Sequence, residues 1–258
     1  MTAGAPHVNH VVITGAAGAI GSALARAMRA AWPEVELALV DREEPVQLAR
    51  EVRGTAYVAD LSDLDALPSL VARIEGSGPI DGLVNCAGIM SVRHVASWRW
   101  EDVRELLHVD LLAPLRLQDL VLRGMVERGA GLVINISSMA GRVPLRGCVY
   151  YGAAKAGLAM ASEIARADLA GRGVQVLTVY PGPVKSALEA GARAEYGGGG
   201  LFGRFAPTGD ASVLAERIMR AIAADEPRVI YPRLYGVGWT APNVSRWIAL
   251  SYGPPPVA

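Results

Sequence analysis

The segment HVVITGAAGAIG, residues 10–21, runs from an apolar stretch through a glycine-rich turn into a stretch of helical period. Glycines after a strand and at the start of a helix are typical of dinucleotide-binding βαβ units. Gly15, Gly18 and Gly21 recur at every third position, which permits a tight turn and lets backbone amides approach a pyrophosphate. The segment predicts the start of a dinucleotide-binding fold. A glycine-rich turn that holds no ligand is the alternative.

Short apolar runs continue along the chain and alternate with longer segments of helical period. The runs are apolar on both faces, as parallel strands covered by helices must be. Strands are expected at 10–15, 36–41, 56–60, 80–85, 131–137, 174–182 and 228–232. Helices are expected at 19–31, 64–75, 98–128, 150–170 and 209–224. The alternation predicts one Rossmann-type α/β domain over 1–258, a doubly wound parallel sheet of about seven strands with helices on both faces.

Composition excludes several classes of protein. Zero net charge over 258 residues gives no electrostatic footprint for nucleic acid or anionic lipid. No stretch approaches the roughly 18 uninterrupted apolar residues of a membrane span, and the first residues do not resemble a signal peptide. Cys86 and Cys148 are too few for a disulfide framework and lack zinc-site spacing. We expect a cytoplasmic protein with no metal site and no nucleic-acid or membrane partner.

Asp41 ends the second predicted strand, at the spacing of about 20 residues after Gly21 that suits a carboxylate on the adenosine ribose hydroxyls. Because a carboxylate there repels a 2′-phosphate, it favours NAD over NADP. Arg42 could instead accommodate that phosphate, so NADP stays open. Asp41 could also merely begin a turn.

The segment CVYYGAAKAG, residues 148–157, contains one of only two lysines, Lys155 and Lys185, in a chain with 23 arginines. Tyr151 and Lys155 are four residues apart and therefore share a helix face. An adjacent ammonium stabilises phenolate, so Lys155 is expected to lower the pKa of Tyr151 toward neutrality. A buried tyrosine beside a lysine that reaches solvent is the alternative.

Ser138 follows an apolar strand, at the sheet edge where ligands of such folds bind. Its hydroxyl could hydrogen-bond a substrate carbonyl while Tyr151 donates a proton. A serine that caps the next segment is the alternative.

Five segments together resemble the motif series of the short-chain dehydrogenase/reductase family in its compact branch. They are TGAAGAIG (14–21), NCAG (85–88), NISSMAG (135–141), YGAAK (151–155) and PGPVKS (181–186). The resemblance implies an oxidoreductase that transfers hydride between NAD(H) and an alcohol or ketone. It also implies that Tyr151 is the general acid/base and that Ser138 positions the substrate oxygen. Lys155 would bind the nicotinamide ribose and lower the pKa of Tyr151. A homodimer or homotetramer is also implied.

The same resemblance assigns the dinucleotide contacts to the glycine turn, the ends of the strands and the PGPVKS segment. The residues expected to bind it are Gly15, Ala17, Gly18, Ala19, Ile20, Gly21, Asp41, Arg42, Asp60, Leu61, Asn85, Ala87, Gly88, Tyr151, Lys155, Pro181, Gly182, Val184 and Ser186. The glycine spacing departs from the compact branch, since Ala19 takes a usual glycine position. The threefold spacing is similar to a longer, nucleotide-sugar-modifying branch.

A second departure is Asp110, which stands where the family commonly has a catalytic asparagine. Its charge should favour Lys155 as ammonium and oppose phenolate at Tyr151. We predict a working proton relay with a raised pH optimum, and an ordinary helix carboxylate is the alternative.

The substrate pocket is expected to be apolar, which suits a hydrophobic secondary alcohol or ketone. Its predicted lining is Met90, Met139, Val143, Leu145, Leu188, Tyr196, Phe202 and Phe205. The glycine-rich segment 187–207 is predicted to be a mobile lid. The tail 233–258, with Trp239 and Trp247, should make subunit contacts or pack across the cleft, and it lacks the basic face of a membrane-surface helix.

Two other functions remain open. One is an NADPH-dependent carbonyl reductase. The other, motivated by Asp110, is a cofactor-binding sensor or scaffold with weak turnover.

Overall fold

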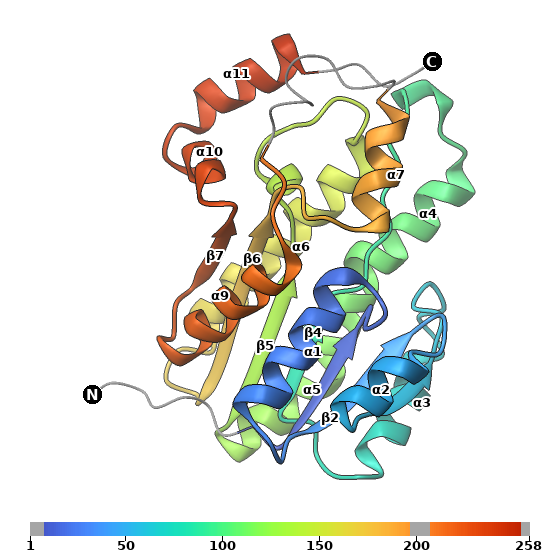
Figure 1. Cartoon of the computed structure of the whole chain (residues 1–258), viewed down its shortest axis with the longest axis vertical. Coiled ribbons are helices and arrows are strands. Elements are labelled where there is room, and N and C mark those ends of the chain that lie inside the picture. Colours follow the sequence, from blue (N-terminus) through green and yellow to red (C-terminus); the bar gives the residue numbers. More distant parts are fainter. Residues whose placement is uncertain (1–7, 197–206, 254–258) are drawn as a thin grey trace.

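The computed structural model describes residues 8–196 and 207–253. Seven parallel strands form one sheet in the order β3-β2-β1-β4-β5-β6-β7 (Figure 1). The strands are β1 His10–Thr14, β2 Glu36–Asp41, β3 Thr55–Val58, β4 Gly82–Asn85, β5 Gly131–Ile136, β6 Val174–Pro181 and β7 Arg228–Tyr231. Every residue of β1 and β5 is buried, as expected for strands covered on both faces. The predicted single Rossmann-type domain is confirmed.

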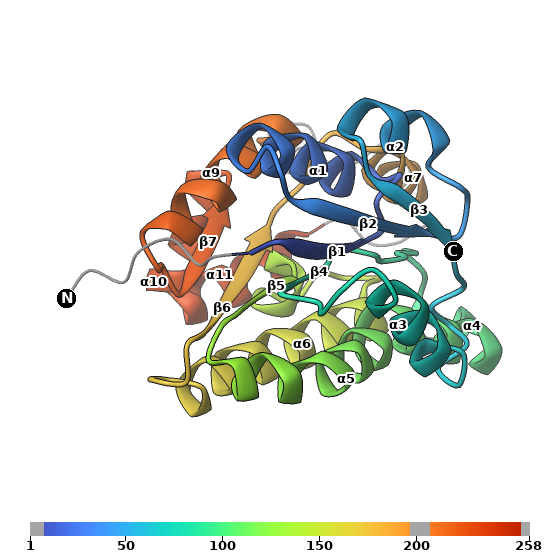
Figure 2. The same ribbon diagram turned by 90° about the horizontal axis from the view of Figure 1, so that it is seen from below.

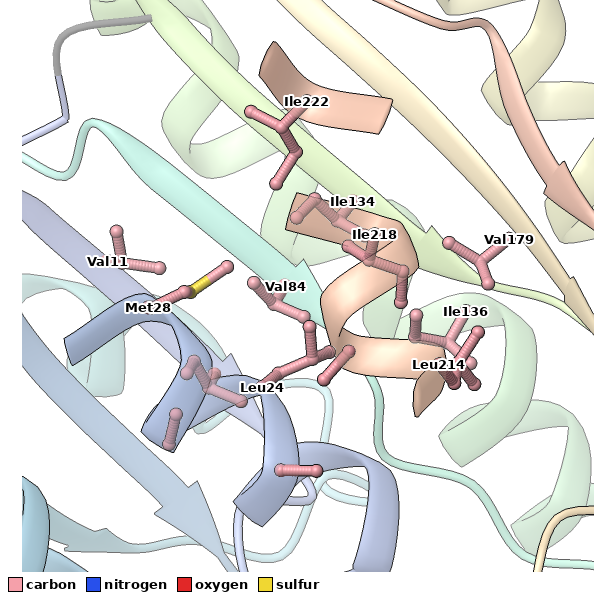
Figure 3. Close-up of a cluster of buried hydrophobic side chains, with 14 of the residues drawn as sticks. Val11, Leu24, Met28, Val84, Ile134, Ile136, Val179, Leu214, Ile218 and Ile222 are labelled. Atoms are coloured by element: carbon pink, nitrogen blue, oxygen red, sulfur yellow. The ribbon is translucent and has the colours of Figure 1, made fainter. Parts of the chain in front are cut away.

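Helices cover both faces of the sheet (Figure 2). One layer contains α1 Ala19–Ala31, α2 Val46–Val52 and α9 Ala211–Ala223. The other contains α3 Leu67–Glu75, α5 Ala113–Arg128 and α6 Val149–Asp168. The core beneath α1 and α9 is built from aliphatic side chains of both helices and of the strands (Figure 3). They include Val11, Leu24, Met28, Val84, Ile134, Ile136, Val179, Leu214, Ile218 and Ile222.

The order in which strands are added to the sheet reverses between β1 and β4. From β1 the chain builds outward through β2 and β3, and it then returns to pair β4 with the other side of β1. In such sheets the crevice at the carboxyl ends of the strands, on either side of this reversal, is where ligands bind. The fold therefore brings the segments after Thr14, Asn85, Ile136 and Pro181 to one edge.

The predicted helix over 98–128 is interrupted. The structure has α4 Trp100–Leu107, a π-helical turn His108–Leu112, and then α5. The wider turn lies where Asp110 points inward and accepts a hydrogen bond from the Ile89 amide (2.8 Å). The interruption thus accompanies a buried polar contact that a periodic sequence pattern does not reveal.

Several helical segments were not predicted. They are α2, α7 Ala187–Glu195, α10 Val237–Thr240, α11 Pro242–Tyr252 and the short 3₁₀ turns Val95–Ser97, Met139–Gly141 and Arg233–Gly236. Helix α7 forms despite Gly191 because the Ser186 hydroxyl accepts a hydrogen bond from the Glu189 amide (3.1 Å) and caps its first turn. The first nine residues of the predicted lid segment 187–207 are thus helical.

Trp239 anchors the C-terminal segment to the sheet. The guanidinium groups of Arg142 and Arg228 each lie 4.4 Å from the centre of the Trp239 ring, within cation–π range. Tyr180 of β6 packs edge-on against the same ring at 5.2 Å and donates its hydroxyl hydrogen bond to Glu163 of α6 (2.8 Å). The segment after β7 is thereby fixed against the sheet.

Candidate active site

The glycine turn is shaped by close packing. Gly15 has φ +65°, and a Cβ there would come within 2.7 Å of the Cα of Ala87. A Cβ on Gly21 would overlap the Gly15 carbonyl oxygen, so the first turn of α1 packs directly on the glycine turn. No side chain caps the start of α1 at Gly18. An uncapped helix N-terminus next to a close-packed glycine turn fits the diphosphate of a dinucleotide.

Asp41 lies beside this turn. Its Oδ2 accepts a hydrogen bond from the Ala17 amide (2.8 Å) and its Oδ1 one from the Arg42 amide (2.7 Å). The carboxylate is therefore held at the edge of the predicted phosphate site, while the Arg42 side chain is exposed.

Asp60 and Leu61, at the end of the next βα unit, have different surroundings. Asp60 is exposed, and hydrogen bonds from the Ser62 amide and hydroxyl lower the pKa of its carboxyl. Leu61 is buried in the hydrophobic layer under α3 and α5, so its side chain is part of the core.

The NCAG segment contributes backbone more than side chains. Asn85 is buried, and its amide group donates to Asn135 Oδ1 (2.8 Å) inside the sheet, so its side chain is not brought to the cleft. Ala87 packs against Gly15. A Cβ on Gly88 would be 3.2 Å from both Asp110 Oδ2 and Lys155 Nζ, so this glycine borders the charged centre of the site.

Ser138, Tyr151 and Lys155 line one cavity. Ser138 follows β5, where its hydroxyl accepts from the Ala140 amide (3.1 Å) and reaches the Pro181 carbonyl at 3.5 Å. Tyr151 and Lys155 lie on the first half of α6 and are both buried. Lys155 Nζ is 5.8 Å from the centre of the Tyr151 ring and donates to the Ile136 carbonyl (3.3 Å). The predicted common face of the helix is present.

Asp110 forms a buried ion pair with Lys155. Its Oδ2 lies 3.1 Å from Lys155 Nζ, and the two side chains are 0% and 4% exposed. Its Oδ1 is held by the Ile89 amide. The Asp110 carboxylate is therefore in direct contact with the predicted catalytic lysine.

Lys155 and Asp110 shift the pKa of Tyr151 in the predicted directions, but burial, which was not considered, has the largest effect. Burial raises the pKa of Tyr151, Lys155 lowers it and Asp110 raises it, and the sum lies above the ordinary tyrosine value. The lysine acts with the predicted sign, but desolvation outweighs it. Burial lowers the pKa of Lys155, but Asp110 and Tyr151 together raise this pKa by more than burial lowers it. Lys155 therefore stays an ammonium ion. Burial raises the pKa of Asp110 more than Lys155 and the Ile89 amide lower it.

The segment after β6 closes the site from the opposite side. The Gly182 amide donates to the Tyr231 carbonyl (2.7 Å), and Val184 forms a parallel bridge with Gly209. Ser186 then caps α7. These contacts place the PGPVKS backbone along the cavity. The predicted dinucleotide residues that line it are Ile20, Gly88, Tyr151, Lys155, Pro181, Gly182, Val184 and Ser186.

The cavity has a volume of about 530 Å³. Its lining includes the predicted substrate residues Met90, Met139, Val143, Leu145, Leu188 and Tyr196. The other two, Phe202 and Phe205, lie outside the described residues. The C-terminal segment adds a wall to the cavity, which agrees with the expectation that the tail packs across the cleft, although its individual residues were not predicted. The wall is formed by Leu234, Tyr235, Val237, Gly238, Ser245, Ile248, Ala249 and Gly253. The aromatic residues of the tail were the one sequence signal that pointed there.

Two kinds of feature are absent from the described residues, 8–196 and 207–253. No group of three or more His, Cys, Asp or Glu side chains there could hold a metal ion. Among the helices in these ranges, none has the length and apolar character needed to cross a bilayer.

Comparison with known proteins agrees with this geometry. The family model for short chain dehydrogenases matches residues 9–197. The ketoacyl reductase HetN of Nostoc sp. strain PCC 7120 is 33% identical over 182 residues, which cover 67% of this chain and 63% of that protein. The matched region is thus less than two thirds of that relative's length.

Solved structures are similar over almost the whole chain. A short-chain dehydrogenase from Streptomyces avermitilis has a TM-score of 0.80 at 25% identity and covers 95% of this chain and 96% of its own. A short-chain dehydrogenase from Sphingobium yanoikuyae in complex with NADPH has a TM-score of 0.78 at 25% identity, with the same coverage. With the family motifs gathered at one sheet edge, the chain belongs to the short-chain dehydrogenase/reductase family and is an NAD(P)-dependent oxidoreductase.

Proposed function

We propose that the protein transfers hydride between NAD(H) and a hydrophobic secondary alcohol or ketone. One observation carries the proposal: Ser138, Tyr151 and Lys155 line the same cavity as six predicted apolar substrate residues. A mostly apolar pocket with a few convergent polar groups is typical of a small-molecule site.

Each of these residues has a role that its position supports. A bound dinucleotide supplies the hydride donor or acceptor at its nicotinamide ring. The Ser138 hydroxyl holds the substrate oxygen, and the Tyr151 hydroxyl gives or takes its proton. Lys155 binds the nicotinamide ribose and stabilises phenolate at Tyr151, since it remains an ammonium ion close to the ring.

Asp110 acts through Lys155. The ion pair holds the ammonium group in place and favours its charged form. Its charge also opposes phenolate at Tyr151. The proposed proton relay therefore works at higher pH than one with a neutral amide at position 110.

The preference for NAD or NADP depends on the residues beside the glycine turn. Asp41 supports NAD because its carboxylate beside the Ala17 amide would repel a 2′-phosphate. The second candidate is an NADPH-dependent carbonyl reductase, which the exposed Arg42 and the NADPH of the Sphingobium yanoikuyae structure favour. Asp41→Ala should lower the ratio of activity with NAD(H) to activity with NADP(H). Glu43→Ala is the matched control, because it removes an exposed carboxylate two residues away.

The lid remains a proposal, and it concerns α7. Leu188, Glu189, Ala192 and Arg193 of α7 line the cavity, so movement of this helix would open or close it. Residues 197–206 of the predicted lid lie outside the described residues. A homodimer or homotetramer in the cytoplasm also remains a proposal. The exposed Met160 and Ile164 on α6 are consistent with subunit contact.

A substrate screen tests the function. Hydrophobic alcohols and ketones would be assayed with NAD(H) and NADP(H), and each hit repeated with Tyr151→Phe. We expect turnover to fall by about 10²–10⁴-fold while dinucleotide binding is kept. Tyr150→Phe is the control, because Tyr150 packs edge-on against Trp98 instead. Dinucleotide binding by calorimetry without turnover across the panel would favour the sensor or scaffold interpretation.

A further inference from the structure

Helix α11 is apolar and yet unburied. None of its eleven residues, Pro242–Tyr252, is buried, although they include Val244, Trp247, Leu250 and Tyr252. Trp247 is 59% exposed, and its ring packs edge-on against Tyr252 at 5.4 Å. Ser245, Ile248 and Ala249 of the helix are half-buried and line the cavity, while these four large side chains stay exposed. Exposed large apolar side chains gathered on one helix are typical of a surface that meets an apolar partner.

The exposed residues of α11 continue into the rim of the cavity. Four further large apolar residues are exposed and also line the cavity: Leu145, Leu188, Leu234 and Val237. We call these eight residues, Leu145, Leu188, Leu234, Val237, Val244, Trp247, Leu250 and Tyr252, the C-terminal apolar surface. Helices α10 and α11 lie at the same end of the molecule as α7, beyond the carboxyl ends of the strands (Figure 1). The apolar surface thus runs from the outside of the protein into its pocket.

The charges beside this surface are basic. Residues 233–258 contain Arg233 and Arg246 and no acidic residue. The fold adds Arg146, which lines the cavity and whose Nη1 donates to the Gly253 carbonyl (3.3 Å). Glu189 also lines the cavity, but its charge is paired with Arg193 (2.6 Å). The tail alone lacks a basic face, and the folded chain supplies part of one from a distant segment.

We propose that the C-terminal apolar surface docks on an anionic lipid membrane, with α11 lying in the interface and the cavity mouth facing the lipid. Tryptophan and tyrosine are enriched at membrane interfaces, and apolar burial combined with arginines is how interfacial helices bind. In a symmetric dimer joined through this surface, Arg146, Arg233 and Arg246 of one copy would approach the same arginines of the other. Residues 233–258 offer no carboxylate to offset this repulsion, which argues against self-association through this surface. The proposal goes beyond the reaction and does not depend on it.

Vesicle co-sedimentation of the full chain tests the proposal. Vesicles of phosphatidylcholine alone would be compared with vesicles that also contain phosphatidylglycerol. We expect binding to the anionic vesicles that weakens as salt rises. Trp247→Glu should reduce it at least about tenfold, since a charge replaces the interfacial aromatic ring. Trp100→Glu is the control, because Trp100 on α4 is 66% exposed but lies outside this surface. Arg233→Gln with Arg246→Gln should reduce the preference for anionic vesicles.

Three results would overturn the proposal. They are no sedimentation with anionic vesicles, equal loss with Trp247→Glu and Trp100→Glu, or a concentration-dependent oligomer that Trp247→Glu dissociates, which would assign the surface to a second copy. Dinucleotide binding by calorimetry shows in each case that the variant is folded. If the proposed reaction is wrong, the calorimetry or the substrate screen would show it, and the vesicle assay would be unaffected.

Discussion

The substitution Asp110→Asn isolates the charge that distinguishes this active site. Asparagine keeps an oxygen for the Ile89 amide and removes the negative charge next to Lys155. Because Asp110 raises the pKa of Tyr151, its removal should lower that pKa. In the proposed reaction, oxidation of an alcohol needs Tyr151 as phenolate, so activity appears as pH rises through this pKa. The Asp110→Asn enzyme should therefore become active at lower pH.

The size of the shift follows from the geometry. The carboxylate lies 3.1 Å from Lys155 Nζ, which lies 5.8 Å from the centre of the Tyr151 ring. The carboxylate is thus within about 9 Å of the ring, and at an effective dielectric constant of about 20 a unit charge at that distance contributes about 2 kcal/mol. This energy corresponds to a roughly thirtyfold change in the phenolate fraction of Tyr151 at a given pH below its pKa. On the acid limb, kcat/KM of the Asp110→Asn enzyme should therefore be higher than that of the wild type by about that factor.

The assay is the pH dependence of kcat/KM for alcohol oxidation, which reports the free enzyme. Asp119→Asn is the control, since this carboxylate on α5 is exposed, pairs with Arg116 and carries the same charge change away from the site. Calorimetry of dinucleotide binding would confirm that the site of the Asp110→Asn enzyme is intact. Identical acid limbs for the wild type and the Asp110→Asn enzyme would refute the reasoning, as would an upward shift.

Three further predictions concern the architecture of the site. Gly15→Ala should lower the free energy of unfolding by about 1–3 kcal/mol in urea titrations, because of its positive φ and the short approach to Ala87; unchanged stability would contradict the packing of the turn. Trp239→Ala should destabilise by about 2–3 kcal/mol and raise KM, since it removes the ring that two guanidinium groups and Tyr180 contact; a wild-type KM would show that the C-terminal wall does not shape the pocket. Glu195→Gln should raise KM about tenfold without changing dinucleotide affinity. The two carboxylate oxygens of Glu195, at the end of α7, accept from the Ser91 hydroxyl (3.2 Å) and the Val92 amide, and glutamine has only one acceptor oxygen; exchange rates of α7 amides that stay at wild-type values would speak against this anchor.

The sheet could be predicted because strands buried on both faces leave an unmistakable apolar run, and β1 and β5 are of this kind. Helix α1 was predicted with its observed bounds for a related reason, since a glycine turn precedes it. The π-helical turn at His108–Leu112 could not be predicted. Its apolar spacing continues through the turn, and only the contact of Asp110 with Ile89 marks the change.

The site shows the same division between local and tertiary information. Tyr151 and Lys155 share a helix face, which spacing alone predicts. The net pKa of Tyr151 depends on burial, which is a property of the folded chain, so the prediction took the lysine effect and missed the larger one. Asn85 resembles a cleft residue in sequence, but its amide bonds to Asn135 on the neighbouring strand. The C-terminal wall meets Met139 and Val143 only after folding.

The origin of that wall has a consequence for biosynthesis. Chains leave the ribosome from the N-terminus, so the glycine turn, Tyr151 and Lys155 are all synthesised before residues 234–253. The strands whose carboxyl ends meet at this edge, β1, β4, β5 and β6, also precede this segment. Only the last part of the nascent polypeptide completes the compartment in which Ser138 and Tyr151 lie. A polypeptide that stalls after β7 would have this edge of the sheet complete and its cavity open to water on the side of the missing wall.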